Sequence, residues 1–183
     1  PTSFFLGAYY SESLFLLATI FSFYFLYRGK YKFAAIFSFF ASFARPLGVF
    51  IAISQVYSYL SLKEFKLAKI RPEILLLFSP LLSLFLYSWF LFAKFGNFFS
   101  FVYAQNYWER QIVGPFATLS SYFVDIFTMK HRPVNDFFDL GFTLSFFFIL
   151  VLGRKILPSS LWIFSAFALV IPASTATLTS MPR

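Results

Sequence analysis

The side chains that could take part in chemistry in this 183-residue chain are few, and most stand among apolar residues. Arginine offers a planar fork of donors that matches a phosphate group, and a carboxylate can accept a hydrogen bond from a sugar hydroxyl. A side-chain amide can add hydrogen bonds to the same kind of polar substrate. We therefore predict binding of a phosphate-bearing, hydroxyl-rich substrate by the candidate residues Glu12, Arg45, Gln105, Arg110 and Arg183.

Each candidate also has a purely structural explanation. Glu12 directly precedes an apolar run, where a neighbouring serine could cap a helix and the carboxylate could complement the positive helix end. Arg45 lies between two apolar runs, where it could be a turn residue whose side chain reaches the membrane surface. An arginine in or near hydrocarbon is costly, which favours a functional or pairing reason for Arg45. Glu109 could simply pair with a neighbouring cation.

No motif of a soluble enzyme accompanies these residues. The chain contains no glycine-rich phosphate loop, no HExxH and no GxSxG. It has no cysteine, and its single histidine, His131, stands in a basic stretch that predicts a solvated loop. We therefore predict no metal site and no cofactor.

The composition indicates what kind of molecule holds the candidates. About 60% of the residues are hydrophobic, 32 are phenylalanine, and only 12% are charged. A water-soluble fold needs a larger polar surface, so the composition argues against a soluble, disordered or collagen-like protein, and against nucleic-acid binding despite a net charge of +8. The sequence predicts an all-α, polytopic membrane bundle, because the apolar stretches lack the alternation of a barrel.

Charge-free runs mark about six membrane segments. A membrane span needs roughly 20 apolar residues, so the shorter runs must tilt or cross only partway. The predicted segments are residues 13–27, 33–44, 46–62, 74–93, 140–153 and 156–182.

Basic connections set the predicted orientation. Residues 28–32, 63–71 and 154–155 form three short basic connections, which are expected on the cytoplasmic side. If all three lie there, the chain must turn back between the first and second, so Arg45-Pro46 becomes the outer turn of a short hairpin. The alternative is one long helix that is kinked at Pro46.

The outer side then collects most of the remaining polar groups. Residues 94–136 form a long outer connection within the bundle. Its aromatic residues alternate with amides and charges, which favours an interfacial helix lying on the bilayer. An ordinary aromatic belt is the alternative, although it explains Gln105 and the Glu109-Arg110 pair less well.

Four short elements resemble the PIG-V family, the GPI mannosyltransferase II-like proteins. They occur in the family's order along the chain. The elements are Pro1-Thr2-Ser3-Phe4-Phe5-Leu6 with Tyr10-Ser11-Glu12-Ser13-Leu14-Phe15, then Ala44-Arg45-Pro46-Leu47-Gly48, then Ala104-Gln105 with Trp108 and Arg110, and finally Ser180-Met181-Pro182-Arg183.

The resemblance implies a membrane glycosyltransferase of the GT-C type. Such an enzyme would transfer a hexose, with mannose expected, from a dolichyl- or polyprenyl-phosphate donor to a glycolipid or other acceptor on the outer face. It adds Trp108 to the substrate-binding candidates. It also implies that residues 1–183 are a partial domain. The first helix and an acidic outer loop with the catalytic Asp are expected upstream of Pro1, and further helices are expected after Arg183. The membrane would be the plasma membrane in a prokaryote and the endoplasmic reticulum in a eukaryote. The alternative is a non-catalytic transporter, flippase or scaffold for lipid-linked sugars.

Overall fold

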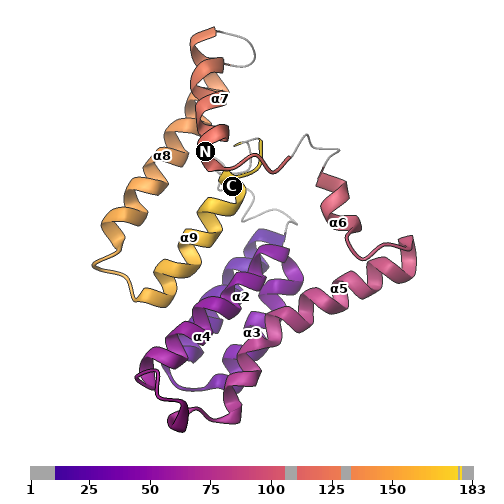
Figure 1. Cartoon of the computed structure of the whole chain (residues 1–183), viewed down its shortest axis with the longest axis vertical. Helices are drawn as coiled ribbons and strands as arrows, with labels where there is room; N and C mark the ends of the chain where they lie inside the picture. The colour runs from indigo at the N-terminus through magenta and orange to yellow at the C-terminus, as the bar shows by residue number, and fades with distance from the viewer. Residues whose placement is uncertain (1–10, 106–110, 129–132, 177, 179–183) are drawn as a thin grey trace.

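The computed structural model describes residues 11–105, 111–128, 133–176 and 178. In this part of the chain the regular structure is helical, apart from an isolated antiparallel bridge between Ile112 and Thr175 (Figure 1). The predicted all-α fold is confirmed. The elements are α2 (Ser11–Tyr27), α3 (Tyr31–Ala44), η1 (Pro46–Phe50), α4 (Ile51–Leu62), η2 (Leu67–Lys69), η3 (Pro72–Phe78), α5 (Ser79–Phe95), α6 (Ser100–Tyr103), α7 (Pro115–Thr128), α8 (Pro133–Gly153) and α9 (Ser159–Ala173).

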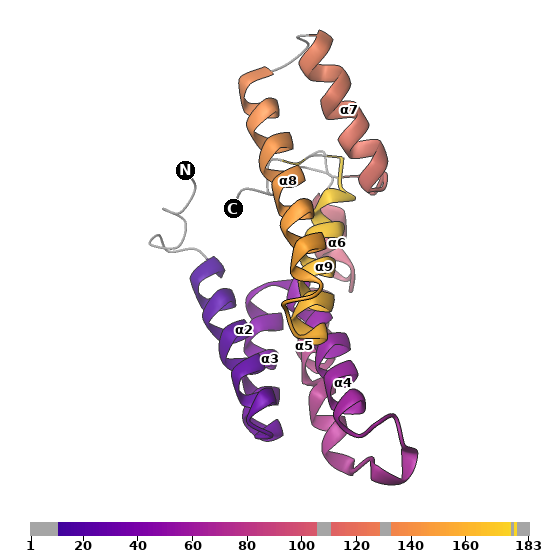
Figure 2. The ribbon, with the colours of Figure 1, turned by 90° about the vertical axis from the view of Figure 1, so that its left-hand side faces the viewer.

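Helices α2 and α3 lie side by side, as Figure 2 shows. Small residues occupy buried positions on both helices, among them Ala18 on α2 and Ala34 and Ala41 on α3. Small side chains let helix backbones approach closely, which is how helices associate where no water drives them together. Hydroxyl groups then tie α3 to α5, because Ser42 Oγ donates to the carbonyl of Pro80 at 2.9 Å.

The chain turns back at Arg45. This residue is extended, with φ −147° and ψ 131°, and the following proline opens the 3-10 turn η1. The rings of Tyr31, at the start of α3, and Tyr59, near the end of α4, lie 5.2 Å apart. One helix through both would separate them by about 40 Å. The predicted hairpin is therefore present, and the kinked-helix alternative is wrong.

Gly48 makes this turn tight. A Cβ atom added at Gly48 would lie 2.6 Å from the Cα atom and the backbone nitrogen of Ser42 on α3. Only a residue without a side chain allows η1 to rest on the α3 backbone at this distance.

The three basic connections lie at one end of the bundle. The Tyr27 hydroxyl, just before the first connection, is 2.7 Å from Ser160 Oγ, just after the third. One small pocket is lined by Tyr27, by Leu62 at the end of α4 and by Ser160. In Figure 1 all three connections are at the lower ends of their helices, whereas the turn from α3 to η1 is at the upper end. The predicted grouping of these connections is confirmed, and which side faces the cytoplasm stays a prediction.

Helix length supports fewer membrane spans than the sequence predicts. In the described residues, Pro72–Phe95 and Asp136–Gly153 are long and apolar enough to cross a membrane. Four other apolar helices are shorter, namely Ser11–Tyr27, Tyr31–Ala44, Pro46–Leu62 and Ser159–Ala173. Six membrane segments therefore stay a prediction.

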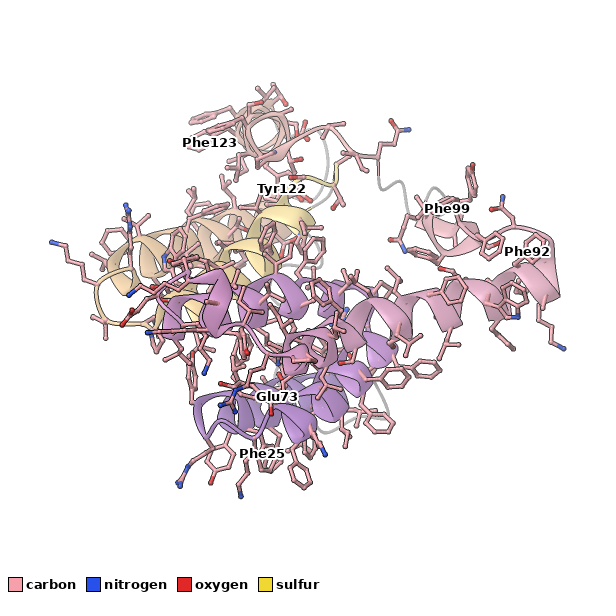
Figure 3. All side chains as sticks on the ribbon, turned by 60° about the horizontal axis from the view of Figure 1, so that its bottom comes forward. Phe25, Glu73, Phe92, Phe99, Tyr122 and Phe123 are labelled. Carbon is pink, nitrogen blue, oxygen red and sulfur yellow. The ribbon has the colours of Figure 1, made fainter. Side chains whose placement is uncertain are left out.

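The outer connection differs from the predicted interfacial helix. Helix α5 ends at a turn in which Gly96 has φ +71°. The Phe92 and Phe98 rings stack across this turn with their centroids 4.3 Å apart. Figure 3 labels Phe92 and Phe99 on the two sides of the turn. The following helix, α6, has only four residues. The 14-residue helix α7, which was not predicted, packs against α8 and α9.

The last apolar run is also shorter as a helix than predicted. Helix α9 ends at Ala173, and the chain then pairs with the segment that precedes α7. Ala176 N donates to the carbonyl of Gln111 at 2.8 Å, and Val113 N donates to that of Ser174 at 3.0 Å. The Tyr122 hydroxyl, on α7 near the centre of Figure 3, accepts from Leu178 N at 2.8 Å.

Candidate substrate site at the Glu12–Arg45 ion pair

Arg45 is held by its own backbone at the turn between α3 and η1. Its N–H donates to the carbonyl of Ala41 at 3.0 Å, and its carbonyl accepts from Gly48 N at 2.8 Å. The guanidinium projects from this fixed point and is 38% exposed. A partly exposed guanidinium on a rigid turn can meet a ligand without first reorganising the backbone.

Glu12 comes to Arg45 from the first turn of α2. Its Oε1 lies 3.5 Å from Arg45 Nη1, which is an ion-pair distance rather than that of a short hydrogen bond. The Glu12 side chain is 12% exposed, and its Oε2 is buried with no hydrogen-bond partner among the described residues. A carboxylate oxygen in that position is costly to leave unsatisfied, so it is able to accept from a ligand or a water molecule.

The structural explanations for these two residues hold only in part. Glu12 does lie in the first turn of its helix, where a negative charge is favourable. Its carboxylate nevertheless pairs with Arg45 across the bundle, which helix capping alone does not require. Glu12 therefore has both the helix-end position and the ion pair, and its role in substrate binding stays a prediction.

The other sequence candidates are not joined to this pair. Gln105 is an exposed residue after α6, and its Nε2 donates to the carbonyl of Phe101 at 3.5 Å. Trp108, Arg110 and Arg183 lie outside the described residues. The pairing of Glu12 with Arg45 is thus the part of the predicted site that the structure brings together.

An apolar groove runs along the helix that carries Arg45 at its end. It has a volume of about 530 Å³ and lies between α3 and the η3–α5 helix. Its lining is almost entirely carbon, with a lysine at the end near the basic connections. The lining residues are Lys32, Ala35, Ile36, Phe39, Phe40, Leu76 and Ser79. A groove of this kind suits a hydrocarbon chain.

Buried polar groups inside the bundle were missed by the sequence reading. Gln55 on α4 is fully buried, and neither atom of its amide has a partner in the described part of the chain. Thr19 on α2 and Ser83 on α5 have buried hydroxyls in the same state. Gln55 is the single amide side chain in the charge-free run 46–62. An isolated amide among apolar residues was the feature of the sequence that could have predicted a buried polar group there.

No group of three or more metal-ligating side chains is found in the described ranges of the chain.

Comparisons with protein-family models, curated proteins and solved structures find no match for this chain. The resemblance to the PIG-V family therefore rests on the short sequence elements alone, and what it implies is a proposal. The element 44–48 now has a physical explanation, since Arg45 pairs with Glu12 and Gly48 permits the close turn.

Proposed function

We propose that this chain belongs to a multi-pass membrane glycosyltransferase. It would transfer a hexose, with mannose expected, from a polyprenyl- or dolichyl-phosphate donor to a glycolipid or other acceptor on the side opposite the basic connections. The observation that carries the proposal is the Glu12–Arg45 ion pair at that end of the bundle. It joins a phosphate-binding cation to a carboxylate beside strongly apolar helices.

The membrane setting is supported by the exposed surface of the two longest helices. Only 22% of the apolar window in Pro72–Phe95 and 17% of that in Asp136–Gly153 is buried within the protein. A core helix of a soluble protein would be mostly buried. Large side chains instead face outward along both helices, including Phe85, Trp89 and Phe148. An exposed apolar surface of this extent is favourable in contact with lipid.

Arg45 is proposed to bind the donor phosphate. Transfer requires the acceptor hydroxyl oxygen to form a bond to the anomeric carbon while the bond from that carbon to the phosphate oxygen breaks. The bonding electron pair leaves with the lipid phosphate, and the acceptor proton passes to a carboxylate base, which the resemblance places upstream of Pro1. Arg45 would stabilise the negative charge that develops on the phosphate. Glu12 would orient the guanidinium, and we assign it no proton transfer.

The test measures sugar transfer in membranes that contain the full-length protein. Labelled mannosyl-phosphopolyprenol serves as donor, and Arg45→Ala is compared with Arg154→Ala, an exposed arginine in a basic connection. We expect Arg45→Ala to lose at least about 100-fold in rate, because a charge-assisted contact made in the transition state is removed. Arg154→Ala should keep the wild-type rate.

Normal transfer by Arg45→Ala, with membrane insertion equal to that of the wild type, would contradict the assigned role. Movement of labelled donor across the membrane without sugar transfer by the wild type would favour the transporter alternative.

A further inference from the structure

A small polar pocket lies at the end of the bundle that holds the basic connections, where the ends of α2 and α4 meet the start of α9. Its volume is about 110 Å³, well above the roughly 10–15 Å³ that one water molecule requires. Six of its eight lining residues carry a hydroxyl group. The lining consists of Tyr27, Tyr57, Ser58, Ser61, Leu62, Pro158, Ser159 and Ser160.

Several of these hydroxyls have no partner within the described part of the chain. Tyr27 and Ser160 bond to each other at 2.7 Å. Ser58 is only 9% exposed, yet its hydroxyl makes no hydrogen bond there. Tyr57 and Ser159 are exposed residues, and their hydroxyls also have no partner among these residues. A serine hydroxyl that lines a pocket and has no protein partner can donate to a ligand there.

The electrostatic surroundings of the pocket favour an anion. The three basic connections supply nine lysines and arginines but one acid, Glu64, and a second acid, Glu73, follows in the first turn of η3. Lys66 and Lys69 both hydrogen-bond to Glu64, which lowers the pKa of its carboxyl group and keeps it paired. Helix α9 begins at the pocket, and its cap residue, Pro158, makes no side-chain hydrogen bond and has no N–H. No side chain at the cap position therefore hydrogen-bonds to the first N–H groups of this 15-residue helix, and its positive end lies beside the pocket.

We propose that this pocket binds a phosphoryl group, carried either by a lipid head group or by a small soluble phosphate. Ionised phosphate oxygens accept hydrogen bonds, and lining hydroxyl groups of α4 and α9 that have no protein partner in the described residues can donate to them. A neutral sugar would also need strong acceptors, and no carboxylate or amide side chain lines the pocket. The site lies at the opposite end of the bundle from the Glu12–Arg45 pair and does not depend on sugar transfer.

The experiment measures thermal unfolding of the purified full-length protein in a non-ionic detergent, followed by tryptophan fluorescence. The protein is titrated with phosphatidic acid, with inorganic phosphate, and with phosphatidylcholine as the zwitterionic control. We expect a saturable rise in the unfolding midpoint with phosphatidic acid and none with phosphatidylcholine. An equal rise with inorganic phosphate would show that a soluble phosphate is enough to occupy the pocket. A rise with phosphatidic acid alone would show that the pocket binds the phosphate of a lipid head group.

Three variants test whether the pocket is responsible. Ser58→Ala and Tyr57→Phe remove one lining hydroxyl each, and we expect each to weaken phosphatidic acid binding by about tenfold. Ser83→Ala is the matched control, because Ser83 is a buried serine without a partner in the described residues but lies on α5 and not in the pocket. It should bind as the wild type does.

If both pocket variants bind phosphatidic acid with wild-type affinity, the proposal is overturned, because the lipid would then be attracted by the basic connections in general and not by the pocket. Equal stabilisation by phosphatidylcholine would overturn it as well. Arg45→Ala should keep the phosphatidic acid response, so failure of this site and failure of the proposed transfer function are distinguished by separate measurements.

Discussion

Arg45 Nη1 and Glu12 Oε1 lie 3.5 Å apart, although the two residues belong to different helical segments. The pair forms because the chain reverses at residues 28–30, between α2 and α3, so that the end of α3 returns to the level at which α2 begins. It combines a partly exposed cation with a nearly buried carboxylate, and this asymmetry leaves part of the guanidinium accessible to a ligand.

Replacing Glu12 with glutamine should reduce sugar transfer. Glu12→Gln keeps the side-chain volume but removes the charge that orients Arg45, and we expect transfer to fall by about tenfold. The measurement is the transfer rate in membranes. Glu64→Gln is the matched control, since Glu64 pairs with two lysines in a basic connection at the other end of the bundle. An unchanged rate in Glu12→Gln would mean that Arg45 needs no orienting partner.

Replacing Gly48 with alanine should destabilise the fold. The added Cβ would lie 2.6 Å from backbone atoms of Ser42, which cannot move aside as a flexible side chain could. We expect a loss of about 3 kcal/mol in the free energy of unfolding, measured by denaturant titration in detergent. Gly141→Ala is the control, because nothing lies within 4 Å of the new Cβ on α8. It should stabilise that helix by up to about 1 kcal/mol. Similar behaviour of both variants would contradict the close packing of the turn.

Replacing Tyr59 with phenylalanine should loosen the connection from α4 to η3. The Tyr59 hydroxyl is fully buried with its ring and accepts from Arg71 N at 3.0 Å. We expect Tyr59→Phe to lose about 1 kcal/mol of stability and to speed trypsin cleavage at Lys66 and Lys69. Tyr103→Phe, at an exposed tyrosine on α6, should change neither quantity. Unaltered cleavage in Tyr59→Phe would mean that other contacts hold the connection.

The orientation can be tested with single cysteines, because the native chain has none. Leu47→Cys in the outer turn should react in intact cells or sealed vesicles with a membrane-impermeant thiol reagent added from outside. Lys155→Cys in a basic connection should react only after the membrane is permeabilised. The reverse pattern would mean that the two sides have been exchanged.

Much of the fold could be predicted from the sequence because its signals are local. The first four charge-free runs predict the helices within two residues of their observed ends, whereas α8 begins earlier and α9 ends earlier than predicted. Pro46 predicts the extended residue before it and the break between α3 and α4. The basic connections predict which helix ends lie together, and the bond between Tyr27 and Ser160 confirms this grouping. These features follow from residue types within a few positions of each other.

Features that depend on distant residues could not be predicted in the same way. The types of Glu12 and Arg45 suggested a role for each, but nothing in the spacing required them to meet. Residues 111–124 form a charge-free run that overlaps α7, but they were not predicted as a helix because they were assigned to the outer connection 94–136. The hydroxyl pocket draws on three helices, and no single segment shows that its serines share one space.

The backbone pairing of residues 111–114 with residues 174–176 has a consequence for how the protein is made. Synthesis proceeds from the N-terminus, so the hairpin of α3 and α4 can close on α2 early, from segments that follow one another directly. Residues 111–114, which lead into α7, emerge without their backbone partners and must wait until residues 174–176 have been translated. A ribosome that stalls before Ser174 would release a nascent chain whose first half is assembled and whose α7 is unanchored, and quality-control proteases should cut such a chain there first.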